Sequence, residues 1–248
     1  MAYDITASSA LLALLGGFLP ALLWLWFWQK EDRHPEPRGI LLLTFSAGMV
    51  MAVVALFLEQ FARFLAEDYL GAVFSPEIIS IILLIVWALI EEVAKYAAAW
   101  RVALRRPCFD EPVDALIYLI TVALGFASLE NLLFLLKIFG TQGSSVGFLT
   151  GNLRFLGATL LHVVASGAVG ASIAFSFFHK EKLFRNVLGG LFLATALHTL
   201  FNFFIIKGEG GSIFKVFIPL WLLAIVLIFI FEKIKGPKNL DKNYKIKN

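Results

Sequence analysis

The sequence predicts an all-α protein, a polytopic bundle of about seven transmembrane helices. Of its 248 residues, 60% are hydrophobic and only 16% are charged, which is more apolar than an ordinary soluble domain. About 20 residues of helix cross about 30 Å of hydrocarbon, and apolar windows of this length recur along the chain. We place the spans near residues 9–29, 39–58, 78–101, 112–137, 152–178, 183–206 and 213–232.

The distribution of lysine and arginine predicts the orientation of the bundle. Positively charged loops stay on the cytoplasmic side of a membrane, and the basic residues gather in four segments that follow alternate spans. These segments are residues 30–38, 101–106, 180–185 and 233–247. The intervening segment 59–77 is acidic, and the turns around Gly143 and Gly208 are rich in glycine. We therefore expect the N-terminus outside and the C-terminus in the cytoplasm.

The residues of each span indicate whether it faces lipid or the interior of the bundle. The first has no lysine or arginine ahead of it between Met1 and Ser9, so we interpret it as a span and not as a cleavable signal. The first and last spans have no ionisable residue in their interior and should face lipid. The fifth span should be central, because it carries a stripe of small residues that lets helices approach closely. These residues are Ala165, Ser166, Gly167, Gly170, Ala171 and Ala174.

Residues 1–232 form a single membrane-embedded domain in this interpretation, and residues 233–248 form a basic cytoplasmic tail. No polar segment is long enough to bury a core of its own. The six lysines of the tail follow the topology rule and suit anionic lipid head groups. We therefore expect contact with the lipid bilayer and no nucleic-acid partner, and the oligomeric state stays open.

Several spans contain ionisable side chains, which are costly inside a bilayer and mostly functional there. From the third span to the sixth these residues are Glu91, Glu92, Lys95, Glu130, His162 and His198. At 1.5 Å of rise per residue, the proposed spans place one group from each of these four spans within about 9 Å of one another in depth. The sequence therefore predicts a polar site between the midplane and the outer surface.

Helical spacing relates these residues further. Glu91 and Lys95 are four apart and share a face, whereas Glu92 is rotated by about 100° from Glu91. One carboxylate can therefore be paired while the other remains available. His198 and Asn202 are also four apart, so an imidazole and an amide share one face. A structural ion pair and hydrogen-bonded packing histidines are the alternatives that the residues leave open.

The residue types fit the hydrolysis of a peptide bond. Two imidazoles and a carboxylate are the ligands of a catalytic zinc site that keeps its fourth position for water, and a further glutamate can act as general base. A metal-free site is the alternative. In it Glu91 or Glu92 activates a water molecule, and His198 and Asn202 stabilise the oxyanion.

Four motifs and two flanking signatures resemble the PrsW family of intramembrane proteases over roughly residues 24–204. The motifs are Glu91-Glu92-x-x-Lys95, Gly125-Phe126-Ala127-x-x-Glu130-Asn131, His162 with Ser166-Gly167 and Gly170, and His198-x-x-x-Asn202. The flanking signatures are Asp32-Arg33-x-Pro35-Glu36-Pro37, and Asp114-x-x-x-Tyr118 after Asp110-Glu111-Pro112. The wider group includes the Abi or CPBP proteins and the CAAX prenyl endopeptidases, in which the second motif usually ends in histidine. Here that position is Glu130, as in PrsW itself.

The resemblance implies an intramembrane metalloendopeptidase in a bacterial or archaeal cytoplasmic membrane. It implies site-1 cleavage of a single-span membrane protein, such as an anti-sigma factor, at the outer face. The residue types point to zinc as the cofactor, with the metal-free, glutamate-activated water as the alternative. The implied catalytic residues are Glu91, Glu92, His198 and Asn202, the implied metal or water ligands are His162, His198 and Glu130, and the implied supporting residues are Lys95, Asn131 and Ser166. The alternatives are an ion- or proton-coupled transporter that uses Glu91, Glu130 and the histidines as a relay, and an inactive protease-like scaffold.

Overall fold

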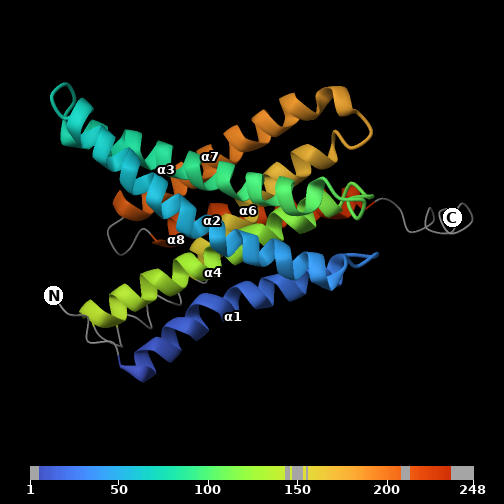
Figure 1. The fold of residues 1–248 in the computed structure, drawn as a ribbon, viewed down its shortest axis with the longest axis horizontal. Helices are drawn as coiled ribbons and strands as arrows, with labels where there is room; N and C mark the ends of the chain where they lie inside the picture. The colour runs from blue at the N-terminus through green and yellow to red at the C-terminus, as the bar shows by residue number, and fades with distance from the viewer. Residues whose placement is uncertain (1–5, 143–145, 147–152, 155, 208–212, 236–248) are drawn as a thin grey trace, which may run out of the picture.

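The computed structural model describes residues 6–142, 146, 153, 154, 156–207 and 213–235, and its regular structure is entirely helical (Figure 1). The α-helices are α1 (Ala7–Glu31), α2 (Arg38–Leu65), α3 (Pro76–Ala99), α4 (Asp114–Gln142), α6 (Ala158–Ala174), α7 (Leu183–Lys207) and α8 (Ile213–Ile234). The π-helical turns η1 (Ala66–Leu70) and η2 (Trp100–Leu104) extend α2 and α3, and the 3-10 turn η3 (Lys180–Lys182) precedes α7. The described residues contain no strand, which confirms the all-α prediction.

Each predicted span corresponds to one helix. Five of the helices, α1, α2, α4, α7 and α8, are long and apolar enough to cross a membrane. Helix α3 has 24 residues and carries Glu77, Glu91, Glu92 and Lys95. Helix α6 has only 17 residues, which amounts to about 26 Å of helix. The polytopic helical bundle is confirmed. Its two exceptions to a long, uniformly apolar helix are α3, with its ionisable residues, and the short α6, which correspond to the third and fifth predicted spans.

Two boundaries differ from the predicted spans. The second helix does not end near residue 58, because α2 with η1 runs from Arg38 to Leu70. Glu59 and Gln60 are good helix formers, so they mark the edge of the apolar stretch without ending the helix. The described part of the fifth span is also shorter than 152–178, and residue 152 lies outside the described residues.

The chain alternates in direction, so the connections sort to two ends of the bundle (Figure 1). The α1–α2, α3–α4 and α6–α7 connections and the C-terminal end of α8 lie together at the right of the figure, and the α2–α3 connection lies at the left. The basic segments 30–38, 101–106 and 180–185, and the described start of the fourth at residues 233–235, therefore reach the same end, and the acidic segment 59–77 reaches the other. Gly143, Gly208 and residues 236–248 lie outside the described residues. The orientation in the membrane stays a prediction.

Helix α4 is the centre of the bundle and packs against α1, α2 and α6. Its contact with α2 is close because glycines face backbone on both sides. A Cβ on Gly48 would collide with the carbonyl oxygen of Val122, and a Cβ on Gly125 would collide with that of Phe45. Backbones that approach this closely gain dispersion contacts where lipid supplies no hydrophobic drive. The α2–α4 crossing therefore depends on these two glycines.

Helix α6 is central as well, as its small residues predict. Fourteen of its 17 residues are buried, and it packs against α4, α7 and α8. Helices α1 and α8 lie at the outside and expose many large apolar side chains, among them Trp26 and Phe229. A short buried helix at the centre and two lipid-facing helices at the rim match the roles that the sequence indicates.

The two flanking signatures meet at the end of the bundle where the basic segments lie. The Tyr118 hydroxyl donates a hydrogen bond to Glu36, and burial raises the pKa of the Glu36 carboxyl. The Asp114 carboxylate accepts hydrogen bonds from the backbone N–H groups of Asp110 and Glu111, at 3.0 and 2.7 Å. These contacts tie the α1–α2 and α3–α4 connections to the first turns of α4.

The α2–α4 crossing predicts a large difference between two glycine substitutions. Gly48→Ala should lower the free energy of unfolding by about 1–3 kcal/mol, because the new methyl group forces apart two packed backbones. Gly189→Ala is the matched control, since a Cβ at Gly189 meets nothing within 4 Å. Thermal unfolding in detergent, followed by tryptophan fluorescence, measures both. Equal melting temperatures for the two variants would contradict the close crossing.

The orientation predicts which end of the bundle reacts with a membrane-impermeant maleimide. Ser75 is exposed and is the N-cap residue of α3 at the acidic end, while the one cysteine, Cys108, lies at the basic end. Ser75→Cys in a Cys108→Ser background should react in intact cells, and Cys108 of the unaltered chain should react only after permeabilisation. The reverse pattern would show that the N-terminus is cytoplasmic.

Candidate active site

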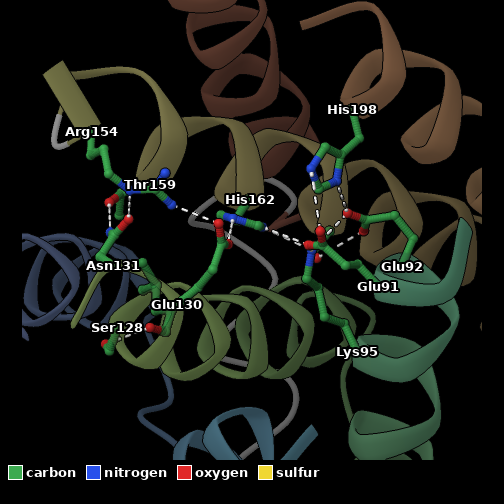
Figure 2. Close-up of polar contacts among 12 residues, drawn as sticks. Glu91, Glu92, Lys95, Ser128, Glu130, Asn131, Arg154, Thr159, His162 and His198 are labelled. Atoms are coloured by element: carbon green, nitrogen blue, oxygen red, sulfur yellow. Dashed lines mark hydrogen bonds and ion pairs between the residues drawn. The ribbon is translucent and has the colours of Figure 1, made fainter. Parts of the chain in front are cut away.

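The predicted site residues come together from four helices (Figure 2). Helix α3 supplies Glu91, Glu92 and Lys95, α4 supplies Glu130 and Asn131, α6 supplies His162 and Ser166, and α7 supplies His198 and Asn202. The side chains of Glu91, Glu92, Lys95, Glu130, His162 and His198 point toward one another in the interior of the bundle. Residues more than 100 positions apart in the chain therefore form one polar cluster.

Lys95 lies in the middle of the cluster and its side chain is completely buried. Its ammonium is 2.8 Å from Glu92 Oε1, 3.3 Å from Glu91 Oε2 and 2.8 Å from His162 Nδ1. It also lies over the ring of Phe126, 4.5 Å from the ring centroid. A buried charge is tolerated only when it is paired and hydrogen-bonded. The predicted Glu91–Lys95 pair is present, and Glu92 and His162 complete the contacts of the ammonium.

His162 is held at both ring nitrogens. Its Nδ1 faces Lys95, and its Nε2 lies 2.8 Å from Glu130 Oε2. An ammonium has only donors, so Nδ1 is the accepting nitrogen and Nε2 carries the proton that is donated to Glu130. The unprotonated Nδ1 also lies 3.9 Å from Glu91 Oε2.

His198 is oriented in the same way by a different carboxylate. Its Nδ1 lies 2.9 Å from Glu92 Oε1, and its Nε2 lies 3.9 Å from Glu91 Oε1. In the neutral imidazole, donation from Nδ1 to Glu92 leaves Nε2 unprotonated and directed at Glu91. Ser166 adds a longer contact, 3.4 Å, from its hydroxyl to Glu92 Oε2. His198 Nε2 thus turns a free lone pair toward Glu91, whereas the lone pair of His162 Nδ1 accepts from Lys95.

The donor set of Glu91, His162 and His198 fits a divalent metal ion. One ligand atom from each residue lies within 4.8 Å of the others, whereas ligands of tetrahedral zinc are about 3.4 Å apart, so a modest contraction is enough. Each histidine has its other nitrogen on a carboxylate, as histidine ligands of metals usually do. Glu130, the carboxylate ligand that the resemblance implies, instead supports His162 from behind. The structure groups Glu91 with the two histidines.

Arg154 is a further member of the cluster that our sequence analysis missed. Its Nη2 donates to Glu130 Oε1 at 2.6 Å and its Nε donates to Asn131 Oδ1 at 2.5 Å. The Asn131 amide in turn donates to Thr159 Oγ1 at 3.0 Å. The available signal was a lone arginine inside the predicted span 152–178, which looks like a charge at the lipid boundary. Only the fold shows that it reaches Glu130.

A cavity of about 260 Å³ adjoins the cluster. Its polar lining comes from Glu91, Glu130, Arg154, His162, His198 and Asn202, and its other walls are apolar side chains of α4, α6, α7, α8 and Leu153. Neither Glu92 nor Lys95 lines it. Of the two adjacent glutamates, Glu91 is therefore the one that can meet a water molecule or a substrate, and Glu92 acts through His198 and Lys95.

Residues 36–231 match the PrsW family of intramembrane metalloproteases. The chain belongs to this family. It is similar to Protease PrsW of Oceanobacillus iheyensis, at 24% identity over 91% of this chain and 96% of the relative. It is also similar to Protease PrsW of Geobacillus kaustophilus, at 27% identity over 81% and 83%, and of Clostridioides difficile, at 25% identity over 93% and 89%. No solved structure matches it significantly.

As a PrsW family member, the chain is an intramembrane protease and a multi-pass membrane protein. This confirms the family that the motifs indicate and favours proteolysis over the proton-coupled transporter. It also gives the cluster a chemical context, because water has to attack a peptide carbonyl inside the bilayer. In the described structure, the cavity beside Glu91 is where a water molecule, a peptide carbonyl and the side chains of the cluster can meet.

Arg154 should act as a positioning residue for this PrsW family site. Arg154→Gln removes the cation that holds Glu130 against His162, and loss of such a supporting contact typically costs about 10- to 100-fold in activity or metal affinity. Arg105→Gln is the control, because Arg105 stacks on Trp100 beyond the C-terminal end of α3. Protease assays combined with metal titration of both variants measure the effect. Wild-type metal affinity and wild-type cleavage in Arg154→Gln would refute this role.

Proposed function

We propose that this PrsW family member is a zinc-dependent endopeptidase that cleaves a single-span membrane protein, such as an anti-sigma factor, near the extracytoplasmic face. The observation that carries the proposal is the group of Glu91, His162 and His198 on the wall of a largely apolar cavity. A cut of this kind is the first, site-1-type, step of a membrane signalling cascade. The partners in this proposal are the substrate and the surrounding lipid.

The charges of the cluster support a bound cation. Glu91, Glu92 and Glu130 face only two cations, Lys95 and Arg154, so the cluster has one net negative charge when both histidines are in the neutral form that binds a metal. A zinc ion would supply a Lewis acid for the carbonyl and a water of lowered pKa. Glu92 and Glu130 would keep the two imidazoles turned toward it. Lys95 now donates to His162 Nδ1, so it must release that lone pair when His162 becomes a ligand.

The remaining groups can assist the addition of water to the peptide carbonyl. Asn202 lies one helical turn from His198 and lines the cavity, so its amide can donate to the oxyanion that forms. Collapse of that intermediate breaks the C–N bond, and the leaving amine takes the proton that the attacking water gave up. If zinc is absent, Glu91 is the general base, because it faces the cavity and Glu92 does not.

The site's depth supports cleavage near one membrane face. The cavity lies beside residues 198–205 of α7, at the end of that helix away from the basic α6–α7 connection. By the orientation expected from the positive loops, this is the extracytoplasmic half. A peptide bond just inside the outer boundary of a single-span protein would be within reach.

Purified protein in detergent should cleave at least one member of a panel of single-span membrane proteins that includes anti-sigma factors. Glu91→Gln and His198→Ala should each reduce cleavage by about 10²- to 10⁴-fold, and both should lower the zinc content measured by atomic spectroscopy. Glu181→Gln is the control, because Glu181 is exposed and its carboxylate pairs with His179, at 3.4 Å, away from the cluster.

A chelator should abolish cleavage, and added zinc should restore it. Full activity in chelator, together with loss of activity in Glu91→Gln, would overturn the zinc proposal and favour the water activated by Glu91. Identical fragments from wild type and Glu91→Gln would show that the cleavage comes from a contaminant. An intact panel with a proton-driven flux in vesicles would favour the transporter, and an intact panel without flux would favour the inactive scaffold.

A further inference from the structure

A second, larger cavity lies between α7 and α8. It has a volume of about 570 Å³ and is lined by apolar residues except for Lys215. Its lining includes Leu197, Leu200 and Phe201 of α7, Leu220 and Leu223 of α8, and Leu161 of α6 at its floor. Helix α6 packs against both α7 and α8, whereas those two contact each other little. We call this space the α7–α8 groove.

The α7–α8 groove adjoins the catalytic cavity. Leu161 and Phe201 line both spaces. Phe201 also stacks on Phe217, with ring centroids 6.2 Å apart and ring planes within 7° of parallel, and Phe217 lines the catalytic cavity. One aromatic pair therefore stands between the groove and Glu91. The large cavities beside α2–α3 and beside residues 26–41 share no lining residue with the catalytic cavity.

The part of α8 that carries Phe217 contains a proline, which removes one hydrogen bond of the helix. Pro219 lies inside α8, two residues beyond Phe217. Proline has no N–H, so the carbonyl of Lys215 lacks its usual partner within the helix. Proline positions are also where helices kink. The first turns of α8 can therefore move with a smaller loss of hydrogen bonds than an uninterrupted helix would suffer.

We propose that the α7–α8 groove receives the apolar transmembrane helix of the substrate, and that the Phe201–Phe217 pair parts to admit the scissile peptide to the catalytic cavity. The proposal rests on the proposed proteolysis of a single-span protein. The chemistry of the groove selects the occupant. A soluble protein cannot reach an apolar groove at membrane depth, and a helix is the form in which a single segment satisfies its own backbone there. Lipid acyl chains are the competing occupant.

Photo-crosslinking at two neighbouring positions of α8 tests the groove. Leu223 lines it, while Leu222 is 58% exposed and does not. Benzoylphenylalanine is placed at either position in full-length Glu91→Gln protein in phosphatidylcholine vesicles, so the measurement needs no catalysis. The probe is a biotinylated single-span peptide with about 20 leucine and alanine residues in its apolar segment. Position 223 should give about tenfold more crosslinked peptide than position 222, a preference of about 1.4 kcal/mol.

A filling variant provides an independent readout. Leu223→Trp should reduce crosslinking of the same peptide to benzoylphenylalanine at Leu200, and the matched control Leu222→Trp should leave it unchanged. Equal peptide yields at positions 222 and 223, or crosslinks to phospholipid alone, would overturn the groove proposal. Preferential crosslinking at position 223 in a protein that cleaves no membrane substrate would uphold the groove and refute the proposed proteolysis, so the two failures are distinct.

Discussion

The rest of the site depends on the buried ammonium of Lys95. It brings together two carboxylates of one helix turn and an imidazole of another helix, in surroundings where each charge alone would be very costly. Because it donates to His162 Nδ1, it also settles which nitrogen of that ring bears the proton. Glu130 can then accept from Nε2, and Arg154 can neutralise Glu130. One ion cluster thus links α3, α4, α6 and the segment before α6.

The packing of the bundle supports this cluster without contributing to its chemistry. Helix α4 is fixed against α2 by the glycine crossing, and backbone hydrogen bonds from the α3–α4 connection hold its first turn. Glu130 lies about four turns further along the same helix. Helix α6 is short and buried, so His162 has little freedom to move toward lipid. Rigid helices with close crossings keep the side chains of the cluster within hydrogen-bonding distance of one another.

The different roles of Glu91 and Glu92 follow from this arrangement. Both contact the ammonium of Lys95, but only Glu91 lines the catalytic cavity. Glu92 orients His198, and Glu130 orients His162, so each imidazole has one carboxylate behind it and turns its other nitrogen toward Glu91. The same geometry serves a metal ion or a water molecule activated by Glu91. The groove beside Phe201 gives the substrate a route to that point.

Sequence alone determined the membrane class, the helical elements and the ionisable residues at a common depth, because apolar length and helical period are local properties of a chain. It also identified the family, since the motifs occur in order along the chain. Tertiary structure decided what depends on the rotation and crossing of helices. Those are the grouping of Glu91, rather than Glu130, with the two histidines, the arrival of Arg154 at Glu130, and the opening between α7 and α8. No spacing within a single helix specifies which of its faces meets another helix, so these contacts emerge only when the bundle is assembled.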